Sequence, residues 1–165
     1  MCYYFSMAIA RFEKVSEKQF SKDLDAQGFS ANYEDIIIPK RATKGSAGYD
    51  FYLPFDVTIK PGEMVKIPSG IRCFIESEYV LEIFPRSSLG FKYQLCLANT
   101  VGIIDADYYG ADNEGHIIVA LVNRGNKEVE LKKGDRFVQG VFVKYYLAVE
   151  EEIDKVRTGG FGSTN

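Results

Sequence analysis

Asn99-Thr-Val-Gly-Ile-Ile-Asp-Ala-Asp-Tyr-Tyr-Gly110 is the densest signal in this sequence. An apolar run that starts at Gly102 ends in two carboxylates, Asp105 and Asp107. On a strand or hairpin, residues two positions apart share a face. Their carboxylates are ionised at neutral pH and can accept a proton from water, while hairpin backbone can read a planar base through its N–H and C=O groups. The alternative is an ordinary hairpin whose aspartates cap a turn.

Short runs rich in β-branched and aromatic residues extend from this stretch in both directions. Turn signals separate them at Pro61-Gly62, Ser69-Gly70, Ser88–Gly90, Arg124–Asn126 and Lys133–Asp135. Many short strands at close spacing predict an all-β sandwich or barrel, and the long helical patterns of a βαβ protein are missing. The predicted strands are EDIIIP (34–39), FDVTIK (55–60), MVKIP (64–68), IRCFI (71–75), YVLEIFP (79–85), FKYQLCLANTV (91–101), HIIVALV (116–122), KEVELK (127–132) and FVQGVFVKYY (137–146).

The two ends of the chain depart from this rhythm. Residues 8–15 predict a strand, and residues 16–26, with Ser16 as a candidate N-cap and a stop near Gly28, predict a short helix. Residues 150–165 turn from acidic to glycine-rich and predict a mobile arm. We therefore divide the chain into an N-terminal extension (1–33), a β-barrel domain (34–149) and a C-terminal arm (150–165).

Length and composition bound the class of protein. The chain has 165 residues, a net charge of -3, one His and three scattered Cys. This size predicts one domain, the single His116 argues against a multi-His zinc site, and the scattered cysteines fit a reduced, cytoplasmic protein. His116 is interpreted as a loop or interface residue rather than a catalyst.

Charge and hydropathy narrow the choice of partners. The acidic balance argues against stable nucleic-acid or anionic-membrane binding. The sequence contains no apolar run long enough to predict a transmembrane helix. Its first residues lack the basic region of a signal peptide, and Met7 is an alternative start.

Three further stretches combine turns with charged side chains. Ala47-Gly-Tyr-Asp-Phe51 is a turn into a strand, whose carboxylate either serves a site or pairs with a nearby Arg. Phe84-Pro-Arg-Ser-Ser-Leu-Gly90 sets an Arg beside two hydroxyls, which suits phosphate binding; the alternative is a polar turn. Lys133-Gly-Asp-Arg-Phe-Val-Gln139 leads into a strand with Arg136 and Gln139 on opposite faces, or is a hairpin with solvated charges.

The tail Arg157-Thr-Gly-Gly-Phe-Gly-Ser-Thr164 joins a flexible backbone to an aromatic ring and hydroxyl groups. Such a segment can close over a nucleotide, with N–H and hydroxyl groups on phosphate and Phe161 stacked on a base. Arg157 adds a charge-assisted donor. The alternative is a disordered linker or an expression scar.

Taken in order, these five stretches resemble the five motifs of the trimeric dUTP pyrophosphatase (dUTPase) family. The resemblance spans most of the chain and implies a jelly-roll, β-barrel-like subunit (a β-clip fold) and a homotrimer. It also implies Mg²⁺-assisted hydrolysis of dUTP to dUMP and pyrophosphate, which limits uracil in DNA and supplies dUMP for dTMP synthesis. The matching motifs are AGYD (47–50), PRSS (85–88), NTVGIIDADYYG (99–110), KGDRFVQ (133–139) and RTGGFGST (157–164).

The resemblance implies a role for each matching residue. Asp105 matches the general base that activates water for attack on the α-phosphorus, and Tyr108 matches the ring beneath the deoxyribose. Asp50 and Arg136 look like a supporting pair. Uracil recognition is implied for Asn99, Gly102, Ile103, Ile104 and Ile118; phosphate contacts from a neighbouring subunit for Arg86, Ser87 and Ser88; a place near the phosphates for Gln139; and contacts from the arm for Arg157, Phe161, Gly162, Ser163 and Thr164.

The implied metal needs no protein cage, because Mg²⁺ keeps waters and is often bound through substrate phosphates. We therefore assign no direct metal ligand. Two other functions stay open. One is the related dCTP deaminase, which shares the fold but needs a catalytic Glu and a different set of motifs. The other is a nucleotide-dependent regulatory protein, as some phage dUTPases are when they sequester repressors; the N-terminal extension and segment 111–116 are its candidate surfaces.

Overall fold

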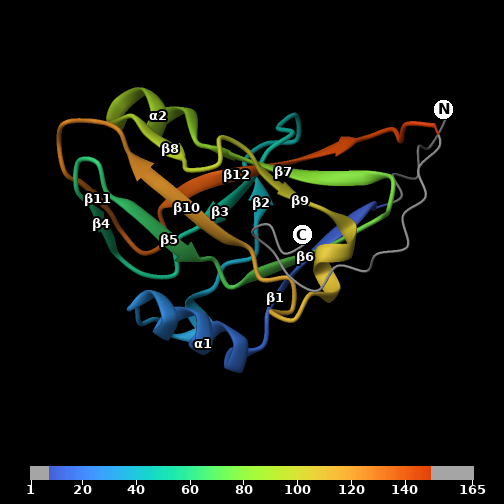
Figure 1. The fold of residues 1–165 in the computed structure, drawn as a ribbon, viewed down its shortest axis with the longest axis horizontal. Coiled ribbons are helices and arrows are strands. Elements are labelled where there is room, and N and C mark those ends of the chain that lie inside the picture. The colour runs from blue at the N-terminus through green and yellow to red at the C-terminus, as the bar shows by residue number, and fades with distance from the viewer. Residues whose placement is uncertain (1–7, 150–165) are drawn as a thin grey trace.

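The structure, a computed structural model of the chain, describes residues 8–149 and consists mainly of small antiparallel sheets (Figure 1). This confirms the predicted β-rich fold with an N-terminal strand and helix. The sheets are a two-stranded pair of β1 (Ala10–Lys14) and β6 (Ile71–Ile75); a second pair of β4 (Val57–Ile59) and β11 (Val129–Leu131); a three-stranded sheet in the order β5 (Met64–Pro68), β10 (Ile118–Asn123), β8 (Leu95–Leu97); and a five-stranded sheet in the order β2 (Lys40–Arg41), β3 (Tyr49–Tyr52), β12 (Arg136–Lys144), β7 (Tyr79–Pro85), β9 (Gly102–Ile104).

The helix α1 (Glu17–Gln27) lies beneath the sheets in the view of Figure 1. Its ends follow the predicted signals. The Ser16 hydroxyl accepts a bond from the N–H of Gln19 at 3.1 Å, which satisfies one of the free donors of the first turn. Gly28 ends the helix at φ +73°, a conformation that favours glycine. Phe20 and Leu24, four residues apart, are buried against the barrel.

One apolar core joins all four sheets and α1. Phe51 of β3, Leu81 of β7, Leu121 of β10 and Phe137 of β12 are completely buried in it. Alternate residues along β6 and β10 point into the core, as expected of sheets with one buried face. Within residues 8–149, no helix has the length and apolar character that a membrane span requires.

The predicted strand at 34–39 is wrong. Tyr33–Asp35 form the short 3-10 helix η1, and the residues after it are extended but join no sheet. Side chains rather than a ladder hold this segment: the Tyr33 hydroxyl donates to the carbonyl of Val15 at 2.7 Å, and Ile36 is buried against Gly70. The β-branched run was read as a strand because it is apolar, yet one buried side chain, Ile36, anchors it.

The long strand predicted at 91–101 is also wrong in its first part. The helix α2 (Ser87–Tyr93) occupies the predicted turn at Ser88–Gly90 and the aromatic residues after it. It ends at Gln94, which adopts φ +56°, and only Leu95–Leu97 form a strand. Aromatic residues favour strands mainly when they are half-buried on a sheet. Phe91 instead lies on the outside of α2 with 91% of its surface exposed.

Candidate functional site

A cavity of about 480 Å³ opens between the three-stranded sheet and the edge of the five-stranded sheet. Its walls are mostly apolar. Six of the residues predicted from the sequence to contact substrate line it together, although Ile118 lies outside the 99–110 stretch that holds the other five. They are Asn99, Gly102, Ile103, Ile104, Tyr108 and Ile118.

The strand β9 forms one wall of this cavity. It is the last strand of the five-stranded sheet and pairs only with β7, Gly102 opposite Ile83 and Ile104 opposite Leu81. Within residues 8–149, no strand pairs with its other edge. Such an edge offers backbone N–H and C=O groups in a fixed order. Gly102 also allows close packing, since a Cβ there would lie 3.1 Å from the Cβ of Ile83.

Asp105 directly follows β9, and here the sequence prediction needs correction. Asp105 and Asp107 do not share a face of a strand, because the strand ends at Ile104 and the 3-10 helix η2 (Ala106–Gly110) begins after Asp105. The Asp105 side chain makes no capping bond to η2, so the alternative of a turn-capping carboxylate does not hold for it. The tight turn of η2 sets Asp105 beside the cavity wall, and Tyr108 forms part of that wall.

A second group of predicted residues gathers around Asp50 of β3. Arg86 reaches one carboxylate oxygen of Asp50 at 2.9 Å, and Arg136 reaches the other at 3.2 Å. The Asp50 side chain is only 9% exposed, so both guanidinium groups stabilise its charge. The predicted contact between Asp50 and Arg136 is therefore present, and Arg86 joins it. We call Asp50, Arg86, Arg136 and Gln139 the polar cluster.

Gln139 belongs to the polar cluster by its place in β12. It lies directly opposite Asp50, and its side-chain amide donates to the carbonyl of Pro85 at 3.4 Å. The prediction that Arg136 and Gln139 face opposite sides is wrong. A β-bulge between Arg136 and Val138 adds one residue to β12, and Arg136 lies opposite Tyr52, two positions from Asp50. Both side chains therefore share one face.

None of the four residues of the polar cluster lines the cavity. Residues directly opposite each other on paired strands share a face. Gln139 pairs with Phe84, whereas Gly102 of the cavity wall pairs with Ile83, the neighbour of Phe84 in β7. Adjacent residues of a strand point to opposite faces, so Gln139 does not share a face with Gly102 and Ile83. Ile103 of the cavity wall pairs with Glu82 and lies on the same face as Gln139.

The remaining predicted site residues that the structure describes lie neither in the cavity wall nor in the polar cluster. Ser87 and Ser88 lie in the first turn of α2, not in the polar turn expected from the sequence. The arm residues Arg157, Phe161, Gly162, Ser163 and Thr164 lie outside the described residues. Between residues 8 and 149, no three His, Cys, Asp or Glu side chains converge as a metal site.

Two features of the site escaped the sequence analysis. Met64 and Lys66 of β5 line the cavity opposite β9. The only signal for them was a lysine that interrupts an apolar strand. The second feature is a bond between Asp23 of α1 and His116, which is completely buried in the turn before β10. No local pattern connects two residues so far apart in the chain.

The two cysteines in the described range differ in environment. Cys73 of β6 and Cys96 of β8 are both free thiols. Cys73 is buried, and this burial raises the pKa of its thiol to about 12. Cys96 is half-buried and accepts a bond from the guanidinium of Arg124 at 3.1 Å. Cys73 therefore stays a thiol at neutral pH and is chemically inert.

Fold and cavity together define a small β protein with an apolar cavity against the edge of a strand. The dUTPase family model matches residues 34–165. The deoxyuridine 5'-triphosphate nucleotidohydrolase of Lactococcus lactis is 46% identical over 132 residues, which cover 78% of this chain and 88% of the relative. That of Nautilia profundicola is 42% identical over 136 residues, 79% of this chain and 92% of the relative. The chain belongs to the dUTPase family.

Solved structures agree with this assignment. The dUTPase from Streptococcus mutans superposes with a TM-score of 0.70 at 35% identity, covering 85% of this chain and 99% of the other. A dUTPase of Staphylococcus bacteriophage 80alpha, whose description refers to control of the transfer of virulence genes, superposes with a TM-score of 0.66 at 18% identity, covering 88% of this chain and 96% of the other. The second likeness shows a shared fold alone.

Proposed function

We propose that this chain is a dUTP diphosphatase that hydrolyses dUTP to dUMP and pyrophosphate. The observation that carries the proposal is the edge of β9 along the cavity, which pairs with no strand within residues 8–149, with Asp105 and Tyr108 in the turn after it. Membership of the dUTPase family gives this geometry its chemistry.

Uracil binds along β9. Its ring presents one N–H donor between two carbonyl acceptors, and the backbone of Gly102–Ile104, with the side-chain amide of Asn99, supplies the complementary groups. Ile118 completes the wall from β10. Cytosine would place a donor where uracil has an acceptor, and an unpaired buried polar group makes that exchange costly. The backbone thus discriminates between the bases without a charged side chain.

Asp105 is the general base. Its carboxylate takes a proton from water, the water oxygen bonds to the α-phosphorus, and the bond from that phosphorus to the bridging oxygen of pyrophosphate breaks. The electron pair of the broken bond leaves with pyrophosphate. Tyr108 lies beneath the deoxyribose, where its ring leaves no room for a ribose 2′-hydroxyl. Its place in the cavity wall with 6% exposure supports this role, since a buried ring cannot easily move aside.

The triphosphate is bound by residues of other copies of the chain. Arg86, Ser87, Ser88 and Gln139 are the candidates, yet none of them lines the cavity of its own chain. A homotrimer resolves this conflict, because a neighbouring copy can bring its polar cluster to a cavity that lacks one. The arm, residues 150–165, closes over the nucleotide, with Phe161 on the base and Arg157, Gly162, Ser163 and Thr164 at the phosphates.

Mg²⁺ fits this site as a companion of the substrate. Because no protein cage exists in the described range, the triphosphate and water supply most of its ligands. When bound, the ion offsets the negative charge that builds up on the leaving phosphates. The chain's own part is to position the α-phosphorus beside Asp105. The scattered thiols are consistent with a cytoplasmic location.

The decisive experiment compares nucleotides. Purified full-length protein is incubated with dUTP, UTP, dTTP or dCTP plus Mg²⁺, and pyrophosphate is measured. We expect release from dUTP alone, and no release once the metal is chelated. Similar rates with all four nucleotides would contradict the proposal. Ammonia from dCTP would favour the deaminase alternative, and capture of a protein partner only in the presence of dUTP would add a regulatory role.

A further inference from the structure

The segment that carries the catalytic candidates joins no sheet in residues 8–149, although Arg72 of β6 donates to the carbonyl of Tyr109 at 2.9 Å. Residues 105–116, which we call the η2 segment, contain Asp105, Tyr108 and the turn that leads to His116. None of these twelve residues belongs to a strand. Side-chain contacts must therefore fix the segment, since it has no ladder to hold it in register.

Contacts from the N-terminal extension hold the η2 segment at three points. The Tyr109 hydroxyl donates to the carboxylate of Glu13 in β1 at 2.6 Å. The Ser16 hydroxyl and backbone N–H donate to the two carboxylate oxygens of Glu114, at 2.6 and 2.7 Å. These bonds hold the carboxyl groups of Glu13 and Glu114 in their charged form and lower the pKa of each.

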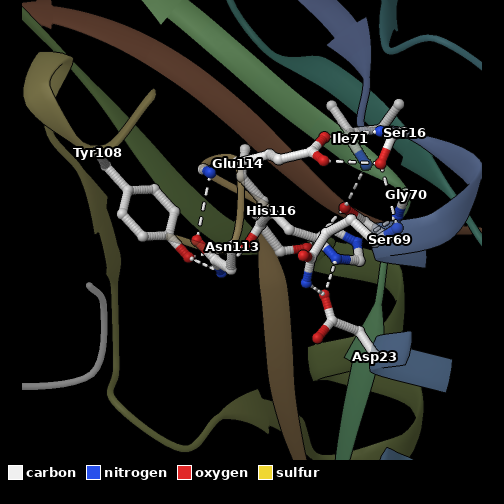
Figure 2. A network of polar contacts seen from close by, with 12 residues as sticks. Ser16, Asp23, Ser69, Gly70, Ile71, Tyr108, Asn113, Glu114 and His116 are labelled. Atoms are coloured by element: carbon white, nitrogen blue, oxygen red, sulfur yellow. Dashed lines mark hydrogen bonds and ion pairs between the residues drawn. The ribbon is translucent and has the colours of Figure 1, made fainter. Parts of the chain in front are cut away.

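The third contact, between Asp23 and the buried His116, is linked to Tyr108 by a network of hydrogen bonds (Figure 2). His116 accepts a bond from the N–H of Gly70 at its Nε2 atom, at 2.8 Å, so the ring proton lies on Nδ1 and is donated to Asp23 at 2.5 Å. The backbone carbonyl of His116 accepts the Tyr108 hydroxyl at 2.8 Å. Asn113 donates to that same hydroxyl at 2.8 Å and closes the network.

Asp23 is held in place for this contact. Its oxygen Oδ2 accepts a second bond from the Gln19 amide, one turn earlier on α1, at 2.8 Å. Burial alone would raise the pKa of Asp23, but the bonds from His116 and Gln19 together lower it below the usual value. Phe20 packs edge-on against the His116 ring, with centroids 6.2 Å apart. The carboxylate of Asp23 and the side chains of Gln19 and Phe20 on α1 thus hold the His116 ring in one orientation.

From these contacts we propose that β1 and α1 position the substrate-binding wall, and that Asp23 and His116 are positioning residues for Tyr108. The inference rests on the proposed function, because Tyr108 is assigned there to the sugar. His116 is not one of the residues that line the cavity. It therefore acts on the cavity through the hydroxyl of Tyr108, which donates to the His116 backbone carbonyl. The N-terminal extension is then a working part of the enzyme, and the family model begins only after it.

The test compares Asp23→Ala with Asp23→Asn. The alanine removes the acceptor of both His116 and Gln19, whereas asparagine keeps an oxygen that can accept both bonds. In Asp23→Ala we expect faster hydrogen exchange at the amides of 105–116, a higher KM for dUTP, and a preference for dUTP over UTP reduced about tenfold or more, because small displacements at a site have large effects. Asp23→Asn should restore most of the preference.

Val129→Ala serves as the matched control, because Val129 is buried on β11, far from η2 in Figure 1. It should lower stability without changing exchange at 105–116 or substrate preference. Tyr109→Phe, which removes only the hydroxyl that reaches Glu13, gives a milder second variant if Asp23→Ala does not fold. It should change both readouts in the same direction and by less.

Three results would overturn the inference: unchanged exchange at 105–116 in Asp23→Ala, unchanged preference between dUTP and UTP, or an equal change of both in Val129→Ala. A wild-type chain without activity on dUTP would instead contradict the proposed function. Hydrogen exchange needs no substrate, so it would then still decide whether Asp23 holds the η2 segment.

Discussion

The cavity and the polar cluster sit on the same sheet and are built in opposite ways. The cavity wall consists mainly of a strand edge, apolar side chains and the ring of Tyr108, whose hydroxyl is hydrogen-bonded to the backbone of His116. One chain supplies all of them. The polar cluster uses charges that pair with one another, and none of its residues lines the cavity. In the proposed function, the strand edge that reads the base comes from one chain, whereas the phosphate contacts come from a neighbour.

The largest effect should come from the carboxylate that follows the cavity wall. Asp105→Asn keeps the shape of the side chain but removes the group that accepts a proton, so turnover of dUTP should fall by about 10²–10⁴-fold while binding persists. Asp107→Asn, two residues further on in the 3-10 helix η2, is the control and should leave turnover within a few-fold of wild type. Pyrophosphate release measures turnover, and calorimetry measures binding. Normal turnover in Asp105→Asn would show that Asp105 is not the base.

A mixing experiment asks whether the two regions belong to different chains in one site. Arg86→Ala and Asp105→Asn should each be nearly inactive alone. After joint refolding, about a quarter of the sites should combine an intact Asp105 with an intact Arg86 from another copy, because subunits assemble at random in a symmetric oligomer. Activity of the mixture is the measurement. If it never exceeds that of the two separate variants, both residues act within one chain and the comparison fails.

Two glycines test how rigid each region is. A Cβ at Gly102 would meet the Cβ of Ile83 at 3.1 Å, an atom fixed to the backbone, whereas one at Gly48 would meet the amide oxygen at the end of the Gln139 side chain at 2.6 Å. Gly102→Ala should therefore lower the free energy of unfolding by about 1–3 kcal/mol and raise KM for dUTP. Gly48→Ala should cost less, because the Gln139 amide can swing away. Denaturant unfolding compares them, and equal losses would show that the two regions are equally rigid.

The smallest effect concerns the pH dependence of stability that comes from Asp23, which helps to hold the η2 segment beside the cavity. The folded-state pKa of Asp23 lies below its ordinary value of 3.8. The unfolded chain therefore takes up a proton first as pH falls, so the stability from this group is complete well above that value and is lost as pH drops through the folded pKa. Asp23→Asn should flatten the dependence of unfolding free energy on pH below about 4. Identical slopes in variant and wild type would show that the Asp23 charge contributes nothing.

Local signals predicted much of this fold. Alternating apolar residues located β6, β7, β10 and β12, and Ser16 with Gly28 located both ends of α1. Motif order brought together the residues that line the cavity. These features succeed because each depends on side chains a few positions apart.

What failed depends on the rest of the molecule. The run at 34–39 looks like a strand, but within residues 8–149 no strand pairs with it, and Ile36 is the residue of the run that is buried in the core. The bulge that brings Arg136 and Gln139 to one face has no marker in the sequence of β12. The bond between Asp23 and His116 joins residues 93 positions apart. Such contacts follow from the assembled fold, not from local preference.

The long separation between the N-terminal extension and the η2 segment also sets an order of events during synthesis. Ser16 leaves the ribosome early, yet Glu114 follows 98 residues later, a delay of about 5–20 s at ordinary rates of translation. Meanwhile β1 waits without β6, which lies some sixty residues downstream. Its sequence, ARFEK, carries three charges in five residues. Charged edges discourage pairing with strands of other chains, so a segment that docks late is also one that can wait safely.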